Sequence, residues 1–453
     1  GLGFSLVNTN PDNAEPIDID YWSSSSSIYG SPGIDNGPPG ASPNIVINEV
    51  LLHSDPPLMD MIEIINADEV AIDIGGWVVS DDLRRPNKFR IPEDTILGSG
   101  ELYVISENQF NPTNSDETLE PFSLNATGDE IFIFSQDENS ILTGYANGTN
   151  FPGSKSGESF GRFVNSEGSV IYHPLNKMTF GEIEAAPRIG PVIISEIMYT
   201  PPTNDDSANT EDEFVELTNF SNDRVALYNV NFPELTWRVR GGIDFDFPKD
   251  LWIDPGESLL LVKFDPTANQ SKLDSFRTIF NIPNSISVLG PFKGQLNNAG
   301  DKIVVKAAED PQPNHSSEAN AVPYYIVDEV TYRSEEPWPI GLSDNGLSMH
   351  RLSGGKIGTE PTNWKGIIPS PGYYKKGVPR VAGRLNTNGI FELEFKALPD
   401  TQYQIEARES LTSGEWKVLR TIEASSTENQ ILFQDNTSPL PEGDSRFYRV
   451  RIF

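Results

Sequence analysis

The same series of short segments occurs twice in this chain, in the same order, and this repetition limits the possible fold more than any other feature. The segment around Glu49 (NIVINEVLL) matches the segment around Glu196 (PVIISEIMY), and the segment around Glu63 matches that around Glu216. The offset between matching positions grows from 147 (196 − 49) to 153 (216 − 63). A series that repeats in this way indicates two duplicated modules, of which the second has longer loops.

The repeated segments have the pattern of β-strands. Runs such as MIEIIN (from Met61) and ELYVIS (from Glu101) alternate with a period of two residues and are rich in β-branched and aromatic side chains. Clusters of Pro, Gly, Asn and Asp separate them, as turns do in β-sandwiches. The one helical candidate is the segment 267–280. The pattern therefore predicts an all-β fold of tandem immunoglobulin-like sandwiches.

The repeats also predict the domain boundaries. The two copies span residues 44–187 and 191–378, and each ends in a similar closing segment that begins at Gly157 or Gly346. Residues 1–40 read as a third closing segment with no module ahead of it, so we expect them to belong to a truncated upstream module. After position 378 the pattern changes, and residues 379–453 contain five or more strand-like runs, enough for a small C-terminal β-sandwich.

The composition limits the partners. The chain has 66 acidic and 33 basic residues, a net charge of −33 that repels the phosphates of nucleic acid, so nucleic acid is not an expected partner. It has no cysteine, and no apolar run approaches the length of a membrane span. An acidic chain rich in Pro and Gly is typical of an extracellular β protein, and we expect an extracellular or cell-surface location.

Five recurring motifs carry a resemblance to a known family. They are I/V-x-I-N/S-E-V/I, an acidic residue ahead of F/I-V-E-L/I-x-N, a strand that contains Trp or Asn, L-N-x-x-G-D-x-I, and a closing G-x-S-x-x-R. In this order they resemble the lamin-tail domain family, in two copies that cover residues 44 to about 378. The last 75 or so residues, with YQIEARESL and FYRVRI, resemble the small immunoglobulin- or fibronectin-like modules of exported bacterial proteins.

The resemblance implies a function without chemistry. In bacterial relatives, lamin-tail modules accompany secreted nucleases and phosphoesterases as accessory domains for adhesion, localisation or spacing. This implies that the chain is not an enzyme but a structural or adhesive array, with a protein or polysaccharide of the cell envelope or extracellular matrix as its partner. The alternative is an accessory, polysaccharide-binding region of an extracellular hydrolase whose catalytic domain lies upstream.

One motif could suggest catalysis. Residues 157–161 match G-x-S-x-G, which in α/β-hydrolases exposes a nucleophilic serine, here Ser159, between a strand and a helix. No such context surrounds Ser159. Its counterpart in the second copy, Ser348, lacks the second glycine and lies on a predicted strand, so the sequence predicts no catalytic residue and no cofactor.

The repeated glutamates are a second candidate site. Glu49 and Glu63, and likewise Glu196 and Glu216, lie on neighbouring strands and can face each other as paired carboxylates. Such pairs transfer protons or bind calcium. The favoured alternative is that each glutamate caps or salt-bridges a strand edge and recurs because the fold recurs.

A third candidate is a calcium site in the acidic segment TNDDSANTEDE. The oxygen ligands would be Asp205, Asp206, Glu211, Asp212 and Glu213. The segment lacks the spacing of an EF-hand, and a hydrated acidic loop is the alternative.

The last candidate is a sugar-binding tryptophan. Most of the seven tryptophans fall in or beside strand patterns, which favours a place in the core. Trp338 differs because prolines flank it and predict a loop, so it is the candidate ligand-binding residue.

Overall fold

The computed structural model describes two compact units, Gly1–Tyr374 and Lys375–Phe453. The described residues are 4–8, 22–28, 30, 32, 43–112, 120–202, 209–313, 318–342, 346–372, 381–387, 390–397, 402–410, 415–423, 429–435 and 445–452. Nearly all elements in these ranges are antiparallel strands, which confirms the predicted all-β, immunoglobulin-like class. No helix in the described ranges is long and apolar enough to cross a membrane.

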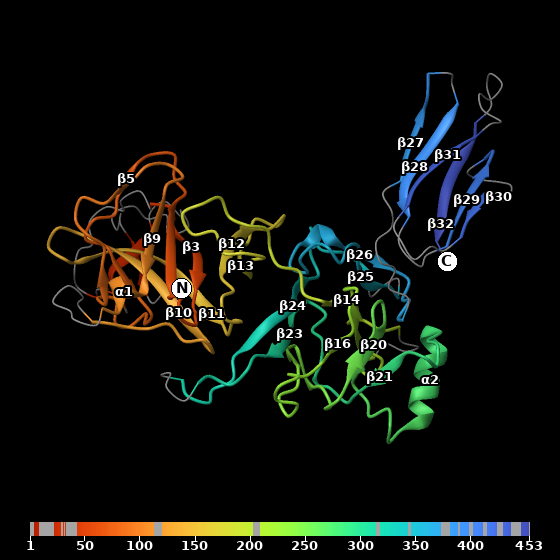
Figure 1. Cartoon of the computed structure of the whole chain (residues 1–453), viewed down its shortest axis with the longest axis horizontal. Coiled ribbons are helices and arrows are strands. Elements are labelled where there is room, and N and C mark those ends of the chain that lie inside the picture. Colours follow the sequence, from red (N-terminus) through yellow and green to blue (C-terminus); the bar gives the residue numbers. More distant parts are fainter. Residues whose placement is uncertain are drawn as a thin grey trace. The chain divides into compact units, whose positions relative to one another are not determined.

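The first module is a sandwich of two sheets (Figure 1). Its elements are β3 (Ile45–Leu51), β4 (Met61–Asn66), β5 (Ile72–Asp73), β6 (Val78–Ser80), β7 (Phe89–Arg90), β8 (Ile96–Leu97), β9 (Leu102–Ser106), α1 (Glu107–Phe110), β10 (Gly128–Gln136), β11 (Leu142–Pro152), β12 (Phe160–Val164) and β13 (Val170–Pro174). One sheet has the order β13-β12-β3-β4-β9 and the other β11-β10-β6-β7, while β5 pairs with β8.

The second module repeats this arrangement with additions. Its elements are β14 (Val192–Met198), β15 (Phe214–Asn219), β16 (Val225–Ala226), β17 (Arg238–Gly241), β18 (Ile243–Asp246), β19 (Trp252–Ile253), β20 (Ser258–Val262), α2 (Gln270–Phe280), β21 (Ser287–Leu289), β22 (Lys293–Gly294), β23 (Gly300–Ala308), β24 (Tyr324–Arg333), β25 (Ser348–Arg351), the 3-10 turn Pro361–Asn363 and β26 (Trp364–Ile367). The sheets have the orders β26-β25-β14-β15-β20-β21 and β24-β23-β17-β18-β22, so the shared strands correspond one for one.

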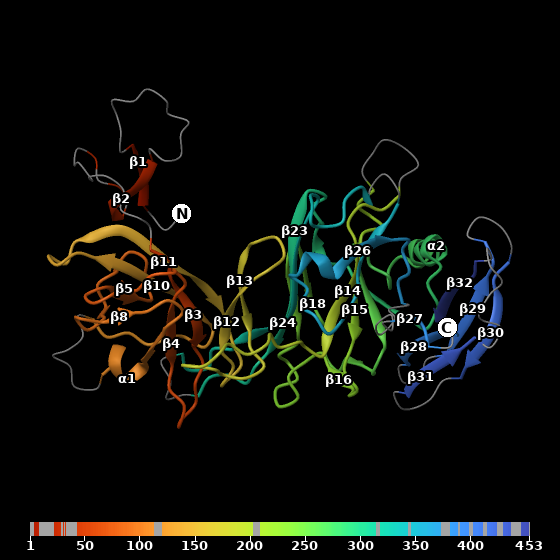
Figure 2. The same cartoon turned by 90° about the horizontal axis from the view of Figure 1, so that it is seen from above.

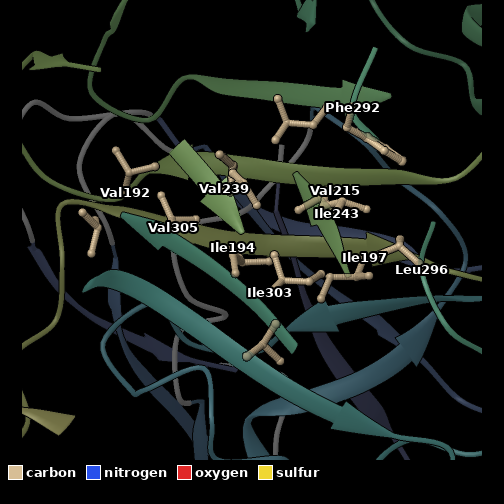
Figure 3. Close-up of a cluster of buried hydrophobic side chains, with 14 of the residues drawn as sticks. Val192, Ile194, Ile197, Val215, Val239, Ile243, Phe292, Leu296, Ile303 and Val305 are labelled. Atoms are coloured by element: carbon tan, nitrogen blue, oxygen red, sulfur yellow. The ribbon is translucent and has the colours of Figure 1, made fainter. Parts of the chain in front are cut away.

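The core of the second module lies between its two sheets. Figure 3 shows Ile194 and Ile197 of β14 facing Val239, Ile303 and Val305 of the opposite sheet. All of these side chains are fully buried. Successive residues along a strand point to opposite faces of the sheet. The polar residues between the core residues of β14 therefore lie on the outer face.

The additions cover that outer face in the second module. The helix expected within 267–280 is α2, which begins at Gln270. Asn269 caps its N-terminus, because its side chain accepts a hydrogen bond from the Lys272 amide. Its buried Phe276 and Phe280 pack against Phe214 of β15. Figure 1 shows α2 beside β21.

A β-bulge in the first strand of each module changes this alternation. In the first module the register between β3 and β4 shifts between Ile47 and Glu49. Regular alternation after Ile47 would place Glu49 in the core. The bulge instead places Val50 in the core, so Glu49 lies on the outer face. The Ile47 amide, freed from the ladder, donates to Asn147 Oδ1 at 3.1 Å.

The second module has the same bulge with a charged acceptor. The register shifts between Ile194 and Glu196, and the Ile194 amide donates to Asp328 Oδ2 at 2.7 Å. The guanidinium of Arg351, whose side chain is 0% exposed, donates to the same Asp328 oxygen and to the Ile194 carbonyl. Asp328 therefore stabilises the bulge and neutralises a buried cation.

The two modules share one hairpin. The buried side chains of Val304 in β23 and Ile326 in β24 belong to the core of the first module. Their neighbours Val305 and Val327 belong to the core of the second. This hairpin thus packs into both modules, one face toward each.

The chain ends form smaller elements. β1 (Phe4–Asn8) and β2 (Trp22–Ile28) make an antiparallel hairpin, and β2 lies beside β11 (Figure 2). The other residues of the 1–40 segment, except 30 and 32, lie outside the described residues.

The C-terminal unit contains two three-stranded sheets. Its strands are β27 (Ala382–Leu385), β28 (Phe391–Ala397), β29 (Tyr403–Arg408), β30 (Lys417–Ile422), β31 (Asn429–Gln434) and β32 (Phe447–Ile452). The orders are β27-β28-β31 and β30-β29-β32. Leu393 and Phe395 of one sheet and Tyr403 and Ile405 of the other form its core.

The bulge of the second module predicts a strong stability effect. Asp328→Ala leaves a buried guanidinium without its carboxylate, which costs about 3–5 kcal/mol. The matched change in the first module, Asn147→Ala, removes only a neutral acceptor and costs about 1–3 kcal/mol. Urea unfolding of the full chain measures both, and equal losses would contradict the role assigned to Asp328.

Candidate functional site: two buried glutamate pairs

The glutamates of the first module face each other across two central strands. Glu49 on β3 is directly opposite Glu63 on β4, and both side chains are 0% exposed. Glu63 lies between the core residues Ile62 and Ile64, which places it, like Glu49, on the outer face of the sheet. Two carboxylates are therefore buried where a strand of a sandwich usually meets solvent.

The segment after β13 covers this pair and donates to it. We call residues 178–185 the first closing strap. The Thr179 amide and hydroxyl donate to the Glu49 carboxylate at 3.0 and 2.8 Å, and the Gly181 amide donates to Glu63 Oε2 at 2.5 Å. Ser159 Oγ donates to Glu49 Oε1 at 2.6 Å, and Asn48 donates to Glu63 at 2.7 Å.

The second module has the same site. Glu196 on β14 is directly opposite Glu216 on β15, and each is 1% exposed. Residues 368–372, the second closing strap, cover them. The Ser370 amide donates to Glu196 at 3.1 Å, and the Gly372 amide donates to Glu216. Ser348 Oγ donates to Glu196 Oε1 at 2.6 Å, as Ser159 does to Glu49.

Both straps reach the glutamates through the same short motif. Thr179-Phe180-Gly181 and Ser370-Pro371-Gly372 each direct the amides of their first and third residues at the two carboxylates. The glycines have φ of +75° and +86°, a left-handed conformation that other residues rarely adopt. The turn that directs these amides at the carboxylates therefore requires the glycine of the T/S-x-G motif.

One position differs between the twin sites. Opposite Glu49 the closing strand β12 has Gly161, whereas opposite Glu196 the closing strand β25 has His350. His350 Nε2 lies 3.3 Å from Glu196 Oε1 and 2.9 Å from Ser348 Oγ.

Burial dominates the electrostatics of the second site. It raises the pKa of both Glu196 and Glu216 above the usual range of a glutamate, and the charge of Glu216 raises that of Glu196 further. Burial also lowers the pKa of His350 to about 4. Burial therefore favours the neutral forms of both the imidazole and the carboxyl groups.

The two serines act as hydrogen-bond donors within this packing. Ser159 and Ser348 are each 1% exposed, and each hydroxyl is directed at a buried glutamate. Ser159 precedes β12, and no helix follows it as a nucleophile elbow requires. The G-x-S motif therefore forms part of the closure of the sandwich, where its serine donates to a buried glutamate.

The structure describes part of the calcium candidate. Asp205 and Asp206 lie outside the described residues, and Glu211 is exposed. Asp212 pairs with Lys272 of α2 at 2.6 Å. Glu213 accepts a hydrogen bond from the Leu296 amide at 3.0 Å.

Asp212 and Glu213 are therefore engaged by contacts within the module. Among the described residues, no group of three or more His, Asp or Glu side chains is arranged to hold a metal ion. Calcium binding by the acidic segment 205–213 stays a prediction.

The candidate ligand-binding tryptophan lies in the core. Trp338 is 2% exposed and belongs to the hydrophobic cluster of the second module. Its indole nitrogen donates to Glu167 Oε2 of the first module at 3.4 Å. The ring face is covered and does not present a stacking platform to solvent.

The residues that sequence reasoning missed are those of the straps. Thr179, Gly181, Ser370 and Gly372 complete the sites, yet none belongs to a strand pattern. The signal that could have found them is the recurrence of T/S-x-G a few residues after β13 and after β26, where glycine marks a special backbone conformation.

Residues 38–147 match the family model described as Lamin Tail Domain. The first module is a lamin tail domain. The match ends within β11, and β12, β13 and the first closing strap follow it. The second module has the same strand order and the same glutamate pair, so it repeats the lamin tail fold.

The chain was also compared with curated proteins and with solved structures. No curated protein matches the sequence. Among solved structures, a DUF4876 family protein from Bacteroides thetaiotaomicron is 12% identical, with 68% of this chain and 95% of that chain covered at a TM-score of 0.28. A likeness at that level carries no argument about the function of the lamin tail array.

The twin serines give a direct test of the closing sites. Ser159→Ala and Ser348→Ala each remove a hydroxyl donor from a buried carboxyl group, which costs about 1–3 kcal/mol of unfolding free energy. The control is Ser334→Ala, because Ser334 is exposed and donates only to the Ala299 carbonyl. Denaturant unfolding of the three variants compares them. A loss in the control as large as in the twin variants would rule out a special role for this hydroxyl.

Proposed function

We propose that this chain is a non-catalytic structural array of a secreted or cell-surface bacterial protein, which spaces and presents surfaces to a partner in the cell envelope or extracellular matrix. The lamin tail modules are the framework of the array, and the C-terminal sandwich adds a further module. The acidic composition, which is typical of extracellular β proteins, supports the location.

One observation carries the proposal: the two lamin tail modules share a hairpin. Val304 and Ile326 pack into the core of the first module, whereas Val305 and Val327 pack into that of the second. Separate modules on a flexible linker move independently, because few contacts cross the boundary. Two cores that share a hairpin favour a rigid unit, which suits a spacer.

Polar contacts reinforce this joint. Arg188, which follows the first closing strap, pairs with Glu158, donates to the Ile326 carbonyl and lies over the Tyr325 ring at 5.9 Å. Arg333 pairs with Glu167 at 3.0 Å across the same boundary.

The connection between β23 and β24 makes a further contact with the first module. The Glu318 carboxylate, on the connection between β23 and β24, accepts hydrogen bonds from the Ala126 and Thr127 amides at 2.5 and 3.3 Å. The contacts therefore spread along the hairpin and resist bending in more than one direction.

The adhesive part of the proposal is tested by co-sedimentation. The full chain is spun with isolated bacterial envelope fragments that are untreated, digested with protease or digested with glycosidase. Loss of binding after protease supports a protein partner. Loss after glycosidase favours the alternative, an accessory region that binds polysaccharide for an upstream hydrolase. No binding to untreated fragments contradicts adhesion and leaves spacing as the function.

Calcium is a separate part of the proposal. Titration of the chelated chain with calcium, followed by calorimetry and a thermal melt, tests the acidic segment 205–213. Heat of binding together with a higher melting temperature supports a calcium-stiffened array, because a ligand that binds only the native state stabilises it. No heat and no shift removes calcium from the proposal.

The joint predicts how the unit unfolds. We expect both lamin tail modules to melt in one calorimetric transition, and Arg188→Ala to separate it into two. The matched control is Arg224→Ala, because Arg224 also pairs with an acid (Asp254, 2.9 Å) and lies over a ring (Trp252, 4.9 Å), but within the second module alone. Separate transitions for the two lamin tail modules in the unaltered chain, apart from that of the C-terminal unit, would contradict the rigid unit.

A further inference from the structure

A third carboxylate joins the glutamate pair of the first module, and it comes from the strap itself. Glu184 lies over Gly161, close enough that a Cβ built on that glycine would be 2.1 Å from Glu184 Oε1. In the second module the corresponding position is occupied by His350. The first site thus has a third acid on the side where its twin has an imidazole.

The surroundings of Glu184 do not compensate its charge fully. One carboxylate oxygen accepts a hydrogen bond from the Arg162 amide, whereas Oε1 is buried and has no hydrogen-bond partner in the described structure. The charged groups that face it are Glu49 from β3, Glu63 from β4 and the guanidinium of Arg162 from β12. Three acids therefore meet one cation at the edge of the buried site.

Protons relieve this imbalance. Burial and, to a smaller extent, the charges of Glu49 and Glu63 raise the pKa of Glu184 to about 7, although the amide and the guanidinium of Arg162 act to lower it. Burial also raises the pKa of Glu63. A carboxyl group whose pKa is higher in the folded state binds its proton more strongly there than in the unfolded chain. Its stabilising contribution is present in full below the unfolded pKa, and it is lost as the pH rises through the folded value.

We propose that the first closing strap is a proton-dependent latch, closed while Glu184 and Glu63 hold protons and open when both are ionised beside Glu49. Two parts of the strap act in opposite directions. The Thr179 and Gly181 amides hold the strap by donating to the glutamate pair, whereas the charge of Glu184 repels that pair. Ionisation therefore drives the strap away from the same sheet on which it rests. This inference does not depend on the identity of any partner.

Opening the strap also loosens the joint between the modules. Two residues after the strap comes Pro187, which forms a β-bridge with Leu175, and then Arg188, which contacts Glu158 and the shared hairpin. A released strap no longer holds these residues in place. The latch thus couples proton concentration to the stiffness of the two-module unit.

Hydrogen exchange of the full chain tests the latch. The protection factors of the Thr179 and Gly181 amides, corrected for the intrinsic pH dependence of exchange, are compared at about pH 6 and about pH 8.5, on either side of the folded pKa. We expect protection to fall about tenfold or more at the higher pH, while the amides of β3 and β4 keep theirs.

Matched variants identify the group responsible. Glu184→Gln keeps the shape but cannot ionise, so the strap stays protected at the higher pH. The control is Glu182→Gln, because Glu182 is an exposed acid on the same strap and its loss leaves the pH dependence unchanged. If Glu184→Gln does not fold, as judged from exchange in β3, Glu63→Gln takes its place with the same expected result.

Two outcomes would overturn the proposal. One is equal strap protection at both pH values in the unaltered chain. The other is a Glu182→Gln variant that behaves like Glu184→Gln, which would assign the effect to overall charge. Neither outcome bears on whether the chain is a structural array, since the calorimetric transition and the co-sedimentation of that proposal are measured separately.

Discussion

A single β-bulge in the first strand of each module is the constraint on which the rest of the structure depends. Without it, the regular alternation of the strand would place Glu49 or Glu196 inside the sandwich. The bulge keeps the apolar residues on the inner face and places each glutamate on the outer face, opposite a second glutamate. It also frees one strand amide, which the next sheet must satisfy through Asn147 or Asp328. One irregularity therefore ties the two sheets together.

Once two carboxyl groups face each other under cover, the chain must supply donors for them. Burying a carboxylate without hydrogen bonds costs far more than any single hydrogen bond gains. Two amides of a T/S-x-G turn and one serine hydroxyl meet this need in each module. The closing straps are consequently held at defined points of their own modules. In the first module, this local need for hydrogen bonds also fixes the start of the connection to the second module.

The sequence was sufficient for the features that repeat and for those with a regular period. The order of the strands, the helix within 267–280 and the C-terminal sandwich follow from patterns that local chemistry creates. The shared hairpin does not, because β23 contains the run Ile303-Val304-Val305 and gives no alternation from which two different faces could be read. Trp338 was expected in a loop and as a ligand-binding residue because of its prolines, yet its ring is buried in the core. Burial of this kind depends on contacts distant in sequence, which a local pattern does not contain.

The twin sites show how duplicated modules can keep a fold while changing its response to the environment. Both retain the glutamate pair, the serine and the strap, because these satisfy the bulge and the exposed strand face. The position opposite the first glutamate is less constrained, and there one copy has Gly161 and the other His350. A glycine leaves room for a third acid, Glu184, whereas a neutral imidazole fills the space without adding charge. The change at this position therefore gives the first module an excess of carboxyl groups that only protons can relieve, and it does so next to the joint that holds the two modules together.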